Sequence, residues 1–407
     1  MKKGAEFLAN ENLGSAKKAK NDEFYTQYRD IEREMNAYLE YNPDVFRGKT
    51  VLLPCDDPEW SNFTKYFAQN FQTIGLKKLI STSYAPNSKP KGIPYQPTLF
   101  EMESEVFSEE KTQTNGKIFT LTRDTTGDDV INVEDLEWNY LEGDGDFRSD
   151  EISALRDESD IVITNPPFSL FREFIGWLIA ANKDFVLIGN MNAITYKEVF
   201  PLIKVNRVWI GATGFNEGMY FYVPENFVYS PTYKFEKAVA GKKASRVPGV
   251  SWFSTIDHGR RHLPLALMTI KDNIKFKQVL QGLDYQKYDN YDAIEVPNTV
   301  AIPSDYEGVM GVPITFLNKY NPEQFEILGS TQRGCHDEVP DTKKYDTYRE
   351  MNPDGTPTGS SGGKTNENAN LSGNDGKRNH FINSDGHVVQ SSYSRIFIRH
   401  RSPQIEN

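Results

Sequence analysis

The sequence predicts an α/β fold in which a parallel sheet carries helices on its faces and the second half consists mainly of strands and loops. Two observations predict it. Apolar runs of strand length alternate with helical patterns from residue 21 to about residue 207, and such alternation is typical of parallel sheets. Beyond about residue 207 the apolar runs are short and no long helical period occurs, which favours antiparallel strands and loops.

The first elements of the parallel sheet follow from local signals. Apolar side chains recur at helical spacing over residues 21–41, and Thr50–Cys55 is a short apolar run typical of a buried strand. Asp57 and Pro58 come next, a preferred N-cap residue before a proline at the first helical position. They predict a helix start, and the buried stripe of that helix is expected to contain Phe63, Tyr66, Phe67 and Phe71.

The later elements are predicted in the same way. An apolar strand over Asp160–Thr164 is followed by a helical pattern over residues 170–181 and by the strand Phe185–Gly189, which together indicate parallel strands. Further strands are expected at residues 77–84, 117–122, 220–223, 250–255 and 394–399. From residue 352 to residue 379 only Ala369 and Leu371 are apolar. Such a stretch buries too little surface to offset its ordering entropy, so we expect residues 340–393 to be a flexible insertion rich in Gly, Ser and Asn.

The charge of the chain is divided unevenly along its length. The 407 residues include 46 Lys and Arg against 57 Asp and Glu, a net charge of −11 that speaks against a polyanionic partner. However, residues 101–160 hold 19 acidic and 5 basic side chains, whereas residues 234–277 hold ten basic and three acidic ones. Either run is compatible with an ordinary solvated surface. The total charge therefore does not exclude a nucleic-acid partner.

Composition also limits cofactors and location. Two cysteines exclude a disulfide scaffold and a four-thiolate zinc site, and six scattered histidines show no ligand spacing, so we expect no metal. No run of 18 apolar residues is present, and the N-terminus leads into polar residues. We therefore expect a cytoplasmic protein without a membrane partner.

The tetrapeptide Asn165-Pro166-Pro167-Phe168 is the most informative motif because it ends an apolar strand, where ligands of open parallel sheets bind. An exocyclic amine on a planar base is a poor nucleophile because its lone pair is conjugated with the ring. The side-chain oxygen of Asn165 and the carbonyl of Pro166 can accept its two N–H groups and release that lone pair. Phe168 offers a flat face on which a flipped base can stack.

This reading leaves alternatives open. An Asn-Pro turn that merely ends a strand is common in loops. Activation of a planar nitrogen in this way is compatible with several methyl-transfer reactions. The acceptor can be an adenine or guanine amine in DNA or RNA, or a glutamine amide in protein.

Flanking residues narrow the choice because seven blocks, in order across about residues 17–330, resemble the EcoRI-type adenine-specific DNA methyltransferases. These blocks are Asn21–Tyr28, Cys55–Pro58 with Ser61–Phe63, Gly143–Ser149, Thr164–Phe174, Ile194–Phe200, Lys287–Ile294 and Gly308–Phe316. The resemblance implies a Rossmann-like methyltransferase sheet with a mainly β and loop target-recognition portion. It implies S-adenosylmethionine as methyl donor and the adenine amine of double-stranded DNA as acceptor.

The resemblance also implies a set of cofactor-binding residues. Tyr25 and Thr26 correspond to an element that precedes the first strand and touches the cofactor. Asp56 and Asp57 stand where most methyltransferases have a glycine-rich turn, although Asp57 is equally suited to be a helix cap. Asp146 and Phe147 resemble the pair that holds the adenine of the cofactor, with the carboxylate accepting its amine and the ring stacking. The sequence thus predicts these cofactor-binding residues: Tyr25, Thr26, Asp56, Asp57, Asp146 and Phe147.

These predictions divide the chain into a basic-tipped flexible arm (1–20), a cofactor-binding catalytic core (21–207), remaining strands with target recognition (208–339), the insertion (340–393) and a closing strand with its tail (394–407). The expected DNA-binding residues are Lys242, Lys243, Arg246, Arg260 and Arg261. We expect a monomer that acts beside a restriction endonuclease. The rival hypotheses are an RNA or protein amide methyltransferase and a DNA-binding protein that has lost catalysis, the latter suggested by the missing glycine-rich turn.

Overall fold

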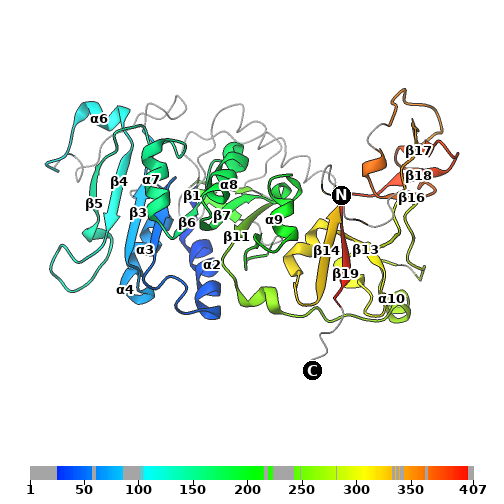
Figure 1. The fold of residues 1–407 in the computed structure, drawn as a ribbon, viewed down its shortest axis with the longest axis horizontal. Helices are drawn as coiled ribbons and strands as arrows, with labels where there is room; N and C mark the ends of the chain where they lie inside the picture. Colours follow the sequence, from blue (N-terminus) through cyan, green and yellow to red (C-terminus); the bar gives the residue numbers. More distant parts are fainter. Residues whose placement is uncertain are drawn as a thin grey trace. The chain divides into compact units, whose positions relative to one another are not determined.

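The computed structural model consists of two compact units (Figure 1). It describes residues 25–56, 61–85, 102, 104–214, 219–222, 243–247, 249–280, 282–331, 335, 339, 343–362 and 365–401. Unit 1 comprises Met1–Ala193 and Val208–Gly259, and unit 2 comprises Ile194–Arg207 and Arg260–Asn407. Strands β8 and β11, which follow residue 207, belong to the large sheet of unit 1, and we expected residues 208–339 to contain remaining strands of that sheet.

Unit 1 contains an eight-stranded mixed sheet with the order β5-β4-β3-β2-β6-β7-β11-β8 (Figure 1). Its strands are β2 (Thr50–Leu53), β3 (Lys78–Thr82), β4 (Lys117–Leu121), β5 (Glu137–Tyr140), β6 (Ile161–Thr164), β7 (Asp184–Asn190), β8 (Trp209–Ile210) and β11 (Val250–Ser254). The four central strands β3, β2, β6 and β7 are parallel, as predicted. The outer pairs are antiparallel, so the α/β prediction is confirmed with a mixed sheet.

The described α-helices of unit 1 begin in different ways, some at a residue whose side chain caps the helix and others without such a cap. They are α2 (Tyr28–Tyr41), α3 (Asn62–Gln69), α4 (Phe71–Ile74), α6 (Glu109–Thr114), α7 (Asp150–Glu158) and α8 (Phe171–Ala180). Ser61 caps α3 by accepting from the backbone N–H of Phe63, and Ser149 caps α7 in the same way. The helix start predicted at Asp57 and Pro58 lies outside the described residues, and the described helix begins with the Ser61 cap.

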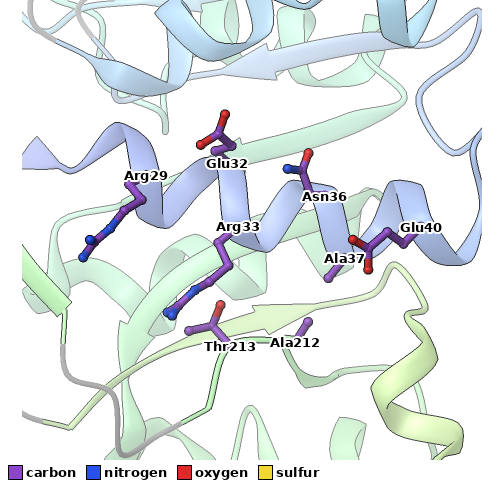
Figure 2. A pocket seen from close by; sticks show the side chains of 8 residues that line it. All are labelled: Arg29, Glu32, Arg33, Asn36, Ala37, Glu40, Ala212 and Thr213. Carbon is purple, nitrogen blue, oxygen red and sulfur yellow. The ribbon is translucent and has the colours of Figure 1, made fainter.

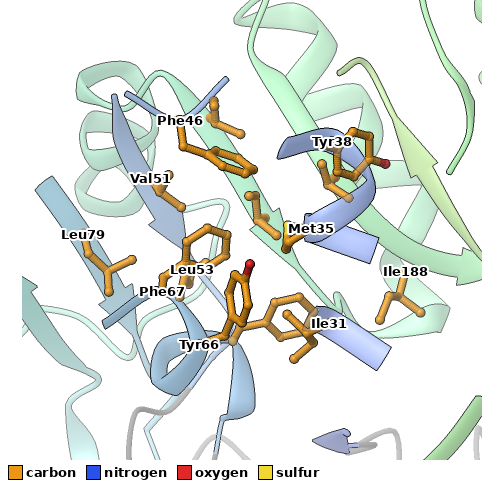
Figure 3. Close-up of a cluster of buried hydrophobic side chains, with 14 of the residues drawn as sticks. Ile31, Met35, Tyr38, Phe46, Val51, Leu53, Tyr66, Phe67, Leu79 and Ile188 are labelled. Carbon is orange, nitrogen blue, oxygen red and sulfur yellow. The ribbon is translucent and has the colours of Figure 1, made fainter. Parts of the chain in front are cut away.

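The core of unit 1 lies on a face of the sheet that α2, α3 and α4 cover. Alternate residues of the strands point to opposite faces, and Val51, Leu53 and Ile188 all point to this one. They pack against Ile31, Met35 and Tyr38 of α2 and against an aromatic group from α3 and α4 (Figure 3). That group contains the predicted stripe Phe63, Tyr66, Phe67 and Phe71, all of which are buried.

A small sheet beside this core brings distant segments together. It has the order β1-β9-β10, formed by β1 (Tyr25–Thr26), β9 (Met219–Tyr222) and β10 (Ala244–Val247). Both neighbours of β9 run antiparallel to it. Met219, Phe221 and Val247 belong to the core described above, so this sheet is anchored to unit 1 by apolar burial.

Unit 2 is built on two four-stranded sheets (Figure 1). The first has the order β12-β13-β19-β14, formed by β12 (Ala293–Glu295), β13 (Val309–Pro313), β19 (Arg395–His400) and β14 (Phe325–Ser330). The strand predicted near residues 394–399 is β19, which pairs antiparallel with both of its neighbours. The helices α9 (Phe200–Lys204) and α10 (Ile270–Phe276) also belong to this unit.

The second sheet of unit 2 lies within residues 340–393, for which we expected a flexible insertion. It has the order β15-β17-β18-β16, formed by β15 (Tyr348–Met351), β17 (His380–Asn383), β18 (Val388–Ser391) and β16 (Asn370–Ser372). The expectation considered apolar burial alone. Polar contacts also hold this segment, since Asn290 donates to the carbonyl of Asn368 (2.7 Å) and accepts from the backbone N–H of Asn370 (3.0 Å).

Candidate active site

The predicted catalytic tetrapeptide lies at the carboxyl end of β6. Thr164 is the last residue of β6, and Phe168 begins a short 3-10 helix that leads into α8. Because β2, β3 and β6 are parallel, their carboxyl ends lie at the same edge of the sheet. Asp56 follows β2, and Ser83 follows β3. The structure therefore brings the tetrapeptide and these two strand ends together.

Asp56 is buried at this edge and is joined to three segments. Its side-chain oxygens accept hydrogen bonds from Ser61 Oγ (2.7 Å) and Thr164 Oγ1 (2.6 Å). Its backbone N–H donates to the carbonyl of Thr82 (3.1 Å), and its carbonyl accepts from Ser81 Oγ. Asp56 thus links β2 to β3, to β6 and to the cap of α3. Asp57, its predicted companion, lies outside the described residues.

The tetrapeptide itself is partly buried. Pro166 is buried, whereas Asn165, Pro167 and Phe168 are partly exposed. The ring of Phe168 meets that of Phe221 edge to face, with centroids 6.5 Å apart and an interplanar angle of 86°. Phe168 also packs against the core of unit 1. The ring is therefore held at its edge by β9.

Tyr25 and Thr26 lie close to the tetrapeptide through β9, because Thr26 pairs with Phe221. The carbonyl of Thr26 also accepts a hydrogen bond from Asn62 Nδ2 (2.7 Å) at the start of α3. Thr26 is 4% exposed, and its Oγ1 is buried with no hydrogen-bond partner among the described residues. A buried hydroxyl of this kind has hydrogen-bonding capacity that a polar ligand or an ordered water can complete.

Asp146 and Phe147 are placed near the same edge but differ from the expected pair. Gly145 has φ +86°, and a Cβ there would overlap the carbonyl oxygen of Ser83, so the loop touches the end of β3. Phe147 is 5% exposed, and its ring lies 4.9 Å from that of Phe174 in α8. Its faces are therefore not an open stacking platform.

The carboxylate of Asp146 forms an ion pair with Arg148, at 2.6 Å between Nη2 and Oδ2. Hydrogen bonds from the Arg148 side chain lower the pKa of Asp146. The group therefore stays ionised as an acceptor at neutral pH.

Two further residues at this edge were not among the predicted cofactor-binding residues. Tyr84 follows β3, and burial together with the carboxylates of Asp144 and Asp146 raises its pKa. The Oγ1 of Thr82 is buried, with no hydrogen-bond partner in the part of the chain that the structure describes. Their positions at a parallel strand end are the sequence signal that would have found them.

Cys55 lies between β2 and Asp56, and burial and the Asp56 carboxylate raise the pKa of its thiol. A thiol whose pKa is raised stays protonated and is a weak nucleophile. Cys55 therefore acts as a packed side chain next to Asp56 rather than as a nucleophile.

The predicted DNA-binding residues fall in different units. Lys243 directly precedes β10 of unit 1, and Arg246 lies within β10, where its side chain is exposed. Arg260 and Arg261 belong to unit 2. Arg261 is only 8% exposed, and its guanidinium donates to Asn206 Oδ1 (3.3 Å). Its placement differs from that of a surface phosphate contact, because the side chain is packed inside unit 2. Lys242 lies outside the described residues.

A groove of about 430 Å³ lies along α2 and the loop after β8 (Figure 2). Figure 2 shows Arg33 extending from α2 toward Thr213. The remaining lining residues are Arg29, Glu32, Asn36, Ala37, Glu40 and Ala212. Both signs of charge line the groove, and none of these residues belongs to the predicted site.

Comparison with known proteins identifies the family. The family described as adenine-specific methyltransferase EcoRI matches residues 12–401. The chain belongs to this family. The type II methyltransferase M.EcoRI of Escherichia coli is 43% identical over 320 residues, which cover 78% of this chain and 89% of that protein. No solved structure matches the chain significantly.

Two Mycoplasma relatives extend the comparison. The type II methyltransferase M.MpnI of Mycoplasma pneumoniae is 38% identical and covers 77% of this chain and 83% of its own length. The type II methyltransferase M.MgeORF184P of Mycoplasma genitalium is 36% identical over 321 residues, which cover 78% of this chain and 85% of that protein. This member of the EcoRI methyltransferase family is a site-specific adenine DNA methyltransferase, as predicted.

Two properties of the described residues bear on metal binding and on membranes. Among them, no group of three or more His, Cys, Asp and Glu side chains is arranged to hold a metal ion. In the same part of the chain, the helices are too short or too polar to span a bilayer.

Proposed function

We propose that this methyltransferase transfers a methyl group from S-adenosylmethionine to the N6 amine of an adenine flipped out of duplex DNA. The observation that carries the proposal is the position of Asn165–Phe168 at the carboxyl edge of the parallel strands, beside Asp56 and β1. The edge is the usual ligand site of such sheets. A Rossmann-like core and a target-recognition portion in residues 208–339 belong to the same proposal.

The residues at this edge fit the proposed cofactor. The ammonium, the ribose hydroxyls and the adenine amine of the cofactor donate hydrogen bonds and need acceptors on the protein. Its carboxylate and ring nitrogens accept hydrogen bonds and need donors. Thr26 and Thr82 each bury a hydroxyl oxygen that no described residue bonds, and Asp146 keeps an ionised carboxylate. When bound, S-adenosylmethionine supplies an electrophilic methyl group on a positively charged sulfur.

We assign the contacts to the cofactor to the predicted residues Tyr25, Thr26, Asp57, Asp146 and Phe147. Asp56 borders the same site, but Ser61 and Thr164 engage its carboxylate oxygens. Phe147 contributes through its edge, since its ring packs against Phe174 and Trp177. No metal takes part in the proposal.

Asn165 and Pro166 prepare the amine for the transfer. Asn165 Oδ1 and the Pro166 carbonyl accept its two N–H groups, which draws the nitrogen toward tetrahedral geometry and localises its lone pair. The nitrogen then bonds to the methyl carbon as the carbon–sulfur bond breaks. The methylated amine loses one proton to water, so no general base of unusual pKa is required.

Pro167 and Phe168 shape the site for the base. Pro167 fixes its own backbone φ and removes a donor, which keeps the acceptor segment stiff. Phe168 is partly exposed and is held edge to face against Phe221, an arrangement that leaves a ring face for a flipped adenine.

The DNA duplex is proposed to contact the basic residues Lys242, Lys243, Arg246 and Arg260, among which the exposed Arg246 on β10 is best supported. Its strand pairs with β9, which contacts Phe168 through Phe221. We further propose a cytoplasmic monomer that works beside a restriction endonuclease, in keeping with the type II names of its relatives.

Labelled S-adenosylmethionine tests the proposal directly. The protein is incubated with the labelled donor and duplex DNA, RNA or protein, and we expect label on the N6 position of adenine in DNA. Asn165→Ala is expected to abolish transfer while cofactor binding, measured by calorimetry, stays close to that of the parent. Label on RNA or protein alone, or an Asn165→Ala variant that has lost cofactor binding but keeps its fold, would contradict the assignment.

A further inference from the structure

The carboxylate of Asp56 is occupied by two hydroxyls of the protein itself. Asp56 is 6% exposed, and its two oxygens accept from Ser61 Oγ at 2.7 Å and from Thr164 Oγ1 at 2.6 Å. Bonds of this length to a charged acceptor are strong and directional. One of the donors, Thr164, directly precedes Asn165.

The pairing of β6 explains why this bond matters. On the β2 side, the ladder joins Val51 to Ile161 and Leu52 to Val162 and then stops. The two residues that follow, Ile163 and Thr164, have no partner in β2 within that register. Thr164 still pairs with Leu187 of β7, so the bond between Asp56 and Thr164 takes the place of the ladder only on the β2 side of β6.

The backbone of Asp56 is itself fixed by hydrogen bonds to β3. Its backbone N–H donates to Thr82, and its carbonyl accepts from Ser81 Oγ, which also contacts Thr64 Oγ1 at 2.9 Å. The carboxylate is therefore a fixed point, attached to β3 and to the start of α3. Thr164 is bonded to that fixed point.

We propose that Asp56 is a positioning residue that acts through Thr164 to fix the direction of the Asn165 and Pro166 acceptors. The inference rests on the proposed function, since it assumes that these two residues receive the adenine amine. Asp56 contacts neither the base nor the cofactor in this proposal. A displacement of the acceptors by about 1 Å lowers the rate of transfer on the order of 100-fold.

Thr164→Val is the decisive variant because it keeps the β-branched shape and removes only the hydroxyl donor. We expect kcat to fall on the order of 100-fold, with the KM for DNA and the Kd for S-adenosylmethionine within about twofold of the parent. Thr164→Ser restores the donor and is expected to recover most of kcat. This split and this rescue would not follow from a general loss of stability.

Asp56→Asn tests the other end of the bond. The amide oxygen can accept from one hydroxyl but cannot replace both carboxylate oxygens, so kcat is expected to fall as well. The double variant Asp56→Asn with Thr164→Val is expected to be no slower than the slower single variant, because both remove the same connection. Ser254→Ala is the control, since it removes a buried hydroxyl from β11 that bonds to Ile256 and is expected to leave kcat unchanged.

Two results would overturn the inference. One is a Thr164→Val variant with the kcat of the parent, which also decides the matter if Asp56→Asn fails to fold. The other is an Asp56→Asn variant whose Kd for S-adenosylmethionine rises tenfold at unchanged kcat, which would make Asp56 a cofactor ligand. Failure of the proposed function is separate, because it is revealed by an Asn165→Ala variant that still transfers methyl groups.

Discussion

Glu34 provides a demanding test of how unit 1 is held together. This glutamate of α2 is fully buried, and its carboxylate accepts three hydrogen bonds. Tyr38 Oη (2.8 Å) and the backbone N–H of Ala212 (2.7 Å) donate to Oε1, and the N–H of Thr213 (2.7 Å) donates to Oε2. Glu34 therefore connects α2 to the loop after β8, the two sides of the groove in Figure 2.

Glu34→Gln is expected to lower the free energy of unfolding of unit 1 by about 2–4 kcal/mol. Glutamine keeps one oxygen that can accept from Tyr38 and Ala212, although without charge. Its amide N–H₂ then faces the N–H of Thr213, and both donors are left unsatisfied. Losing one hydrogen bond to a charged group costs about 1.5–3 kcal/mol, and a buried unsatisfied donor costs about 1–3 kcal/mol, although the two contributions overlap.

Tryptophan fluorescence during urea unfolding measures this change in unit 1 specifically. All five tryptophans, at positions 60, 138, 177, 209 and 252, fall within the residue ranges of unit 1. Glu32→Gln is the matched control because Glu32 is exposed on the same helix. A decrease of less than about 1 kcal/mol for Glu34→Gln, or an equal decrease for both variants, would refute the reasoning.

Three further predictions concern the candidate site. Gly145→Ala is expected to weaken cofactor affinity on the order of tenfold, because its φ of +86° and the nearby Ser83 carbonyl exclude a Cβ; unchanged affinity by calorimetry would contradict it. Arg148→Met is expected to raise the pKa of Asp146 toward its usual value. In the parent, the lowered pKa of Asp146 stabilises the folded state at neutral pH, and this stabilisation is lost as the pH falls through the folded pKa. In Arg148→Met the stabilisation is absent at neutral pH as well. An NMR titration of the Asp146 carboxyl that is identical in both proteins would disprove this prediction. Arg246→Ala is expected to reduce the slope of log K for DNA against log salt by about 0.9, and an unaltered slope would exclude a phosphate contact.

The sequence located the elements that carry the site because each has a strong local signal. The strand ending at Thr164, the Asn165–Phe168 tetrapeptide and the helix of Phe63 and Phe67 were all predicted. Apolar runs and helical spacing depend on neighbours within a few residues, so no tertiary information is needed to read them. The family resemblance stated from the quoted blocks was confirmed by the match over residues 12–401.

Such local patterns do not predict contacts between segments that are distant in the sequence. Phe147 looked like a stacking platform, but α8 covers it through Phe174. Arg261 looked like a surface cation, but it is buried beside Asn206. In each case the deciding neighbour lies elsewhere in the sequence, and the local pattern contains nothing about it.

The sequence by itself thus predicted the central strands and helices of unit 1 and the tetrapeptide that we propose as the site of methyl transfer. Only the tertiary structure decided what surrounds that tetrapeptide. The bond between Asp56 and Thr164 joins residues 108 positions apart. Strand β11 pairs with β7, although residues 191–249 lie between them in the sequence. Such pairings depend on how the whole sheet closes, since the hydrogen-bonding groups involved are common to many residues and acquire partners only when the strands are in place.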